Sequence, residues 1–163
     1  MTPKEQFINA YSQEHATTMR VLRAFPEGKA EIKPHAKLRS ARDLAWVFVA
    51  EQGMCQISLT TGFDWSKPAA MPPAPATLAE IIAAFDLGRQ QLVDSVSRRD
   101  DNLTGTVKFF VAPRTLGDMS LNQFLWMTLC DQIHHRGQFS VYLRMADGIV
   151  PSIYGPTAED HWM

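Results

Sequence analysis

Four long segments of this chain repeat apolar residues at every third or fourth position, which is the spacing of one face of an α-helix. The sequence Thr77-Leu78-Ala79-Glu80 is a capping box, a specific signal for the start of a helix. Capping residues also precede the other three segments, at Thr2, Ser40 and Ser120. We therefore expect an all-α chain with helices over about residues 3–25, 41–61, 78–98 and 121–146. Four amphipathic helices without an internal repeat are typical of a four-helix bundle with at least one long crossover connection.

The connections between these segments differ in length and composition. Residues 63–76 are rich in Pro and Ala, and their length favours a crossover over a tight turn. Residues 104–110 alternate weakly between apolar and polar side chains, which predicts one short extended piece, and residues 150–163 are expected to form an irregular tail. A chain of 163 residues has the usual size of one domain, so we expect residues 1–163 to form a single domain.

The composition excludes several classes of function. The formal net charge is −1 and the sequence has no run of Lys or Arg, so nothing predicts binding to nucleic acid. No apolar run approaches the roughly 20 residues that span a bilayer, and residues 1–6 lack the apolar core of a secretory signal. We therefore expect a cytoplasmic protein without a membrane segment. Cys55 and Cys130 fall inside predicted helices and are expected to be small core residues in a reducing compartment.

The last predicted helix carries a carboxylate and an imidazole on one face. Asp131 and His135 are four residues apart, so they lie one above the other, and apolar residues such as Phe124 and Phe139 share their stripe. A buried charge without a partner costs several kcal/mol, so this pair predicts partners from other helices. The neighbouring His134 is expected to face outward, Arg136 to be a surface or ion-pairing residue, and the mid-helix Gly137 to allow close packing of another backbone.

Two further polar side chains interrupt apolar stripes, Glu51 in the second predicted helix and His15 in the first. Each has an ordinary structural explanation, since Glu51 can pair with an Arg of another helix and His15 can be a hydrogen-bonded core histidine. Together with Asp131 and His135 they would form a mixed carboxylate and imidazole site. Such ligands suit Zn, Mn, Fe or Ni. A metal with an open position acidifies a bound water or thiol, which is the basis of metal-assisted transfer and hydrolysis.

The run His134-His135-Arg136-Gly137-Gln138, followed by Tyr142-Leu143-Arg144, resembles the last-helix motif of the DinB-like family (DinB/YfiT type) of metalloenzymes. Residues 40–51 and 150–156 resemble other parts of that family. The resemblance implies a four-helix bundle with a long crossover, often a homodimer. It also implies a divalent metal held by one His of the second helix and an HxxxH pair of the fourth. Some relatives are transferases or isomerases that use a low-molecular-weight thiol: bacillithiol, mycothiol or glutathione.

The chain departs from this pattern at two of the three metal positions. His135 matches the second histidine of the pair, and Asp131 replaces the first. The place of the second-helix histidine falls on Trp46 or Val47, so Glu51, one turn beyond Val47, or His15 would have to complete the site. The expected ligands are therefore Asp131 and His135 with Glu51 or His15.

Two functional hypotheses follow. In the first, the chain is a metal-dependent transferase or hydrolase that acts on a small molecule, with Gln138 and Tyr142 as hydrogen-bonding residues beside the ligands or facing the substrate. In the second, it is a metal-free member of the family, a small-ligand-binding protein or a dimeric interaction module. Asp131 and His135 would then form a buried ion pair that includes Glu51 or an Arg.

Overall fold

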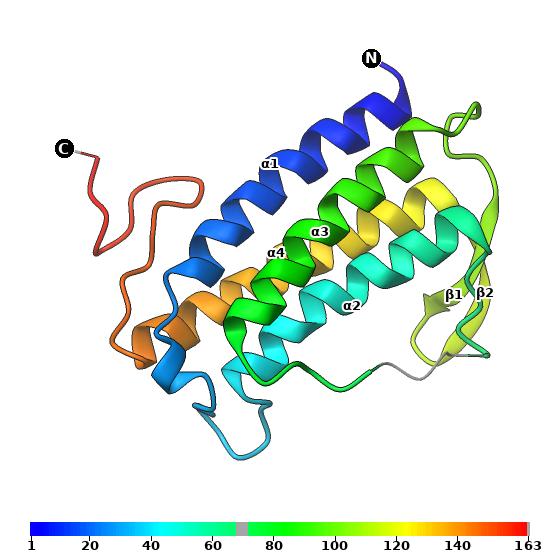
Figure 1. The fold of residues 1–163 in the computed structure, drawn as a ribbon. Helices are drawn as coiled ribbons and strands as arrows, with labels where there is room; N and C mark the ends of the chain where they lie inside the picture. The colour runs from blue at the N-terminus through cyan, green and yellow to red at the C-terminus, as the bar shows by residue number, and fades with distance from the viewer. Residues whose placement is uncertain (68–71, 163) are drawn as a thin grey trace.

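The computed structural model describes residues 1–67 and 72–162, and four long helices account for most of them (Figure 1). The helices are α1 (Pro3–Arg23), α2 (Ala41–Thr60), α3 (Leu78–Ser97) and α4 (Leu121–Met145), with a short 3₁₀ turn, η1, over Glu27–Lys29. All four predicted helices are confirmed within two residues at each end. The predicted caps are present as well, since the side chains of Thr2, Ser40, Thr77 and Ser120 each accept a hydrogen bond from a backbone N–H of the first turn.

The expectation of an all-α chain is wrong in one respect, because two antiparallel strands join α3 to α4. They are β1 (Thr106–Ala112), which overlaps the extended piece predicted over residues 104–110, and β2 (Thr115–Ser120), which was not predicted. The register pairs Val107 with Met119, and both of these side chains are buried. Residues 63–65 hydrogen-bond to β1 through the backbone of Lys108, so the start of the 61–77 connection is held against this hairpin.

The helices pack in a ring in which α2 contacts α3 and α4, and α1 contacts the same two helices. Figure 1 shows that α2 and α3 run in one direction and that α1 and α4 run in the other. The connection after α2 therefore returns along the length of the molecule before α3 begins. Part of this Pro-rich connection, including Pro68, lies outside the described residues.

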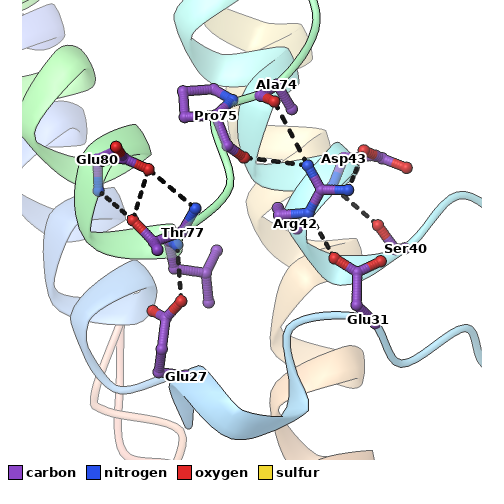
Figure 2. Close-up of polar contacts among 10 residues, drawn as sticks. Glu27, Glu31, Ser40, Arg42, Asp43, Ala74, Pro75, Thr77 and Glu80 are labelled. Atoms are coloured by element: carbon purple, nitrogen blue, oxygen red, sulfur yellow. Dashed lines mark hydrogen bonds and ion pairs between the residues drawn. The ribbon is translucent and has the colours of Figure 1, made fainter.

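Polar contacts hold the far end of this connection to the start of α2 (Figure 2). Arg42 donates hydrogen bonds to the carbonyl oxygens of Pro75 (3.0 Å) and Ala74 (3.5 Å), and its Nε pairs with Glu31. Glu27 accepts a hydrogen bond from the backbone N–H of Leu78, the first residue of α3, at 3.0 Å. These contacts hold the N-terminal ends of α2 and α3 and the η1 segment together. They also hold the end of the connection, from Pro72 to the start of α3.

The core consists of two hydrophobic clusters, one toward each end of the helices. One contains Leu44, Phe48, Phe85 and Phe139, and the other contains Phe7, Leu92, Phe124 and Leu125, among other residues. Between the clusters, α1, α2 and α4 each carry buried polar side chains, among them His15, Glu51, Gln52, Gln132 and Arg136. We call these five residues the polar layer. It lies at mid-height of the four helices, and the candidate site opens from it.

The cysteines and Gly137 depart from expectation. Cys55 is buried as predicted, whereas Cys130 is exposed, and both are free thiols. The close-packing interpretation of Gly137 is also wrong, because a Cβ built there meets no atom within 4 Å. None of the described helices has a stretch that could cross a membrane.

Candidate metal centre

Three potential metal ligands meet where α2 packs against α4. His135 Nε2 lies 3.4 Å from Glu51 Oε1 and 3.7 Å from Asp131 Oδ2. One ligand atom from each of the three side chains lies within 4.8 Å of the other two. The helical spacing of Asp131 and His135 sets their mutual position, and the contact between α2 and α4 supplies Glu51.

Glu51 is the buried member of this group. Its side chain is only 5% exposed, and burial raises the pKa of its carboxyl group to about 7, against the lowering effect of the neighbouring His135. Oε1 faces His135, but Oε2 has no hydrogen-bond partner. A buried carboxylate oxygen without a partner is costly, so this atom indicates a place for a cation or a proton donor.

His135 is oriented by Gln138, one turn further along α4. The Nδ1 atom of His135 lies 3.2 Å from Gln138 Oε1, and an amide oxygen only accepts hydrogen bonds, so Nδ1 carries the hydrogen. Nε2 is then the atom that turns to the two carboxylates. The hydrogen bond to Glu51 raises the pKa of His135 above its ordinary value, against the opposing effect of burial. This is the usual arrangement of a metal-binding histidine, in which the second ring nitrogen is held by a neighbouring acceptor.

These residues fit a divalent metal ion. Two carboxylates and one imidazole form the mixed oxygen and nitrogen set that Zn, Mn, Fe and Ni accept. Three protein ligands also leave positions for water or substrate in metals that take four or more ligands.

A pocket of about 630 Å³ lies directly beside the three ligands. Glu51, Asp131 and His135 form part of its lining, while α2 and the start of the connection after it provide most of the remainder. Trp46 and Trp65 are two of its large side chains, and the indole N–H of Trp46 donates to the carbonyl of Pro72 at 3.0 Å. Apart from Arg39 and Asp43, the charged side chains of the lining are therefore the three potential ligands, and the rest of the lining is mostly apolar.

Comparison with known proteins identifies the family. The model of the DinB family matches residues 1–162. The chain belongs to the DinB family. A curated relative, the uncharacterized protein YrdA of Bacillus subtilis (strain 168), is 26% identical over 159 residues, which cover 96% of this chain and 90% of YrdA.

Two solved structures share the DinB fold. A DinB-like protein from Bacillus cereus ATCC 10987 is 24% identical, with a TM-score of 0.73, and the match covers 92% of this chain and 97% of that one. The DinB-like protein YjoA of Bacillus subtilis is 13% identical, with a TM-score of 0.66, and the match covers 97% and 99% of the two chains. At these identities the two structures support the fold alone.

In this DinB chain the structure brings together three of the four expected ligands. His15 lies elsewhere in the polar layer, where its Nε2 is 3.3 Å from the carbonyl oxygen of Phe85 and its ring stacks on Phe85. Burial lowers the pKa of His15, so the neutral form is favoured. This is the ordinary core histidine that was the alternative interpretation.

Gln138 and Tyr142 were expected to form hydrogen bonds beside the ligands, and only Gln138 does so. Gln138 contacts His135 as described, whereas the hydroxyl of Tyr142 donates to the carbonyl oxygen of Arg39 at 3.1 Å. Tyr142 therefore holds the chain that leads into α2. Trp46 and Val47, the two residues on which the expected place of a second-helix histidine falls, both line the same pocket as Glu51.

The buried face of α4 in this DinB chain is rotated from the predicted stripe. Gln132 and Arg136 are buried, while the Asp131 side chain is 56% exposed. The ligands therefore lie at the edge of the buried face, where a pocket can open, and His134 is exposed as predicted. The expected surface position of Arg136 is wrong, but its ion pairing is correct, since it contacts Glu14 Oε2 at 2.7 Å.

Two aromatic residues in the wall of the pocket were not predicted from the sequence. Phe63 and Trp65 stand in the Pro- and Ala-rich connection, for which only a crossover was expected, yet both line the pocket. Two large aromatic residues just after the end of α2 were the available signal. Aromatic side chains in a loop are usually covered by something, but the sequence does not say by what.

Proposed function

We propose that this chain binds one divalent transition-metal ion through Glu51, Asp131 and His135 and uses it to promote a transfer or hydrolysis reaction on a small molecule held in the adjacent pocket. The observation that carries the proposal is the buried Oε2 of Glu51, which has no partner beside the other two potential ligands. A cation at that place would satisfy this oxygen and neutralise two neighbouring carboxylates.

Each residue has a distinct part in this proposal. Glu51 and Asp131 supply the negative charge that attracts the ion, and Nε2 of His135 supplies the nitrogen ligand. Gln138 keeps Nε2 turned toward the carboxylates by accepting the hydrogen of Nδ1. A metal bound here would act as a Lewis acid and lower the pKa of a bound water or thiol. The apolar pocket would exclude bulk water from the reacting groups.

Metal uptake by the dialysed protein tests this function. The protein is treated with EDTA, dialysed against Zn, Mn, Fe(II) or Ni salts and measured by elemental analysis. We expect about one ion per chain, with an affinity that falls at least tenfold in His135→Ala and in Glu51→Gln. His161→Ala is the control, because His161 is an exposed histidine that lies outside the group of three ligands. A folded wild-type protein that takes up no ion contradicts the proposal.

Val47→His provides a gain-of-function arm for the same experiment. Val47 lines the pocket one turn before Glu51 on α2, so a histidine there would add the ligand that the family pattern has at this place. We expect the affinity for Zn or Ni to rise at least tenfold. Unchanged affinity would indicate that residue 47 does not reach the ion.

A metal-free role is the second candidate, and the 3.4 Å contact between Glu51 and His135 favours it. Protonated His135 would then neutralise Glu51, and the pocket would serve as a small-ligand-binding site without catalysis. Chelators would leave the melting temperature unchanged in this case, whereas they would lower it if a bound metal stabilises the fold.

The single domain, the homodimer and the cytoplasmic location remain proposals drawn from chain length, family resemblance and composition.

A further inference from the structure

The walls of the pocket beside the ligands are apolar and held in place. Trp65 packs edge-on against Phe109 of β1 with ring centroids 5.4 Å apart, and Phe63 lies 6.2 Å from the same ring. A further part of the wall comes from α2, where Met54 and Ile57 follow Trp46 along the lining. Because Trp46 is fixed to Pro72 by a hydrogen bond, the aromatic surfaces are preformed.

Charged groups are few in this pocket, and they comprise three carboxylates, one guanidinium and one imidazole. Apart from Glu51, Asp131 and His135, the described lining contains only Arg39 and Asp43 as charged side chains. Asp43 already lies 3.7 Å from Arg42, outside the lining. A ligand with several charges would leave most of them without a partner against apolar walls, which costs several kcal/mol for each desolvated charge.

We propose that the molecule bound here is largely apolar, with an aromatic or branched aliphatic body and one polar end group. The body packs between Trp46, Trp65 and the α2 wall, and the polar end reaches Glu51, Asp131 and His135. A volume of about 630 Å³ lies within the range of pockets that enclose drug-sized ligands. The inference rests on the proposed function only in taking this pocket as the substrate site. It excludes a multiply charged thiol such as glutathione as the occupant of the pocket.

Filling the pocket from Gly53 provides a direct test. Gly53 lies within α2 and lines the pocket, and a Cβ built on it meets no atom within 4 Å, so Gly53→Trp occupies pocket space without a backbone clash. Gly137→Trp is the matched control. Gly137 is also a mid-helix glycine with no atom within 4 Å of a Cβ, and it lies outside the pocket lining. Circular dichroism establishes that both variants are folded.

Calorimetry of the EDTA-treated full chain with two probes gives the readout. We expect 2-naphthol to bind at least tenfold more tightly than glutathione, with the negative heat-capacity change of apolar burial. The affinity for 2-naphthol should fall at least tenfold in Gly53→Trp and stay within twofold in Gly137→Trp. Absent 2-naphthol binding, tighter binding of glutathione, or equal effects of the two tryptophans would each overturn the proposal.

The same titrations separate this inference from the proposed function. Binding of 2-naphthol without any metal uptake would support the apolar ligand and remove the metal-dependent reaction. Metal uptake without 2-naphthol binding would support the metal centre and overturn the apolar ligand. The probe needs no metal to bind, so the two results are independent.

Discussion

At the scale of single residues, Glu51 determines what the pocket can do. Its carboxyl group is buried, and only one of the two oxygen atoms, Oε1, has a partner. A carboxyl group in such a place is stabilised by a proton, by an imidazolium or by a metal ion, and His135 is near enough to provide the second of these. The Cys55 thiol, one turn further along α2, is fully enclosed, and burial raises its pKa to about 12. Cys55 is therefore an inert neighbour, and the chemistry belongs to the carboxylates and the imidazole.

The raised pKa of Glu51 predicts how the stability of the metal-free protein depends on pH. The folded pKa is about 7, above the ordinary value of 4.5, so the folded state holds this proton more tightly than the unfolded state. The stability that the proton provides is present below pH 4.5 and is lost as the pH rises through about 7. The pKa of His135 is also raised, so its contribution is lost in the same direction.

We therefore expect the melting temperature in EDTA to fall between pH 5 and pH 8, and to fall less steeply in Glu51→Gln, which has no proton to lose at this position. Circular dichroism melts at intervals of half a pH unit measure both slopes. Parallel curves for the wild type and the variant would contradict the raised pKa.

At the scale of helices, the spacing within α4 predicted the candidate site more accurately than the burial of its members. The i,i+4 rule correctly placed Asp131 beside His135, because that relation is internal to one helix. It did not predict that Asp131 would be exposed, because burial depends on which neighbours cover the helix. For the same reason Arg136 was expected near the surface but lies between α4, Glu14 of α1 and Tyr154 of the tail.

Two mid-helix glycines give a paired prediction at this scale. Gly137 has no atom within 4 Å of a built Cβ, so Gly137→Ala should stabilise the protein by about 1 kcal/mol through helix propensity alone. A Cβ on Gly88 of α3 would overlap Gln52 Oε1, and Gln52 is buried with hydrogen bonds to Tyr11 and Phe85. Gly88→Ala should therefore destabilise the protein by roughly 1–2 kcal/mol despite the same gain in propensity.

Urea unfolding measures both glycine variants against the wild type. If Gly88→Ala stabilised the protein as much as Gly137→Ala, the Gln52 side chain would have to move at no cost, and its hydrogen bonds would not hold the polar layer in one arrangement.

At the scale of the whole molecule, the long periodic segments predicted the four helices, but the hairpin between α3 and α4 was only half predicted. β1 has a local alternation that the sequence displays, whereas β2 contains Gly117 and Asp118 and has no strand signal of its own. Its conformation comes from pairing with β1, a contact that no local pattern encodes. The division of the core by a polar layer was indicated by His15 and Glu51, but the buried Gln52, Gln132 and Arg136 were not foreseen.

The polar layer joins elements that are distant in sequence. Arg136 is the member whose burial costs most without a partner, because it carries a permanent charge. Arg136 is fully buried, and its guanidinium contacts Glu14 Oε2 at 2.7 Å and the hydroxyl of Tyr154 at 2.6 Å. Tyr154 in turn donates to Glu14 Oε2 at 2.8 Å, so one triangle of contacts links α1, α4 and the C-terminal tail. The carboxylate is the one full negative charge in this triangle, so its removal should be much more costly than the loss of a hydroxyl.

We expect Glu14→Ala to destabilise the protein by about 3 kcal/mol, because it leaves a buried guanidinium without a counter-charge, and Tyr154→Phe by only about 1 kcal/mol. The double variant Glu14→Ala/Arg136→Met should be more stable than Glu14→Ala alone, since it removes the unpaired charge and keeps an apolar side chain of similar length in the core. Urea unfolding of the wild type, Glu14→Ala, Arg136→Met and the double variant measures the coupling in a double-mutant cycle. Additive losses would mean that Arg136 and Glu14 stabilise the fold separately. A strong coupling would mean that charge pairing stabilises the mid-height of this molecule, in the polar layer from which the candidate site opens.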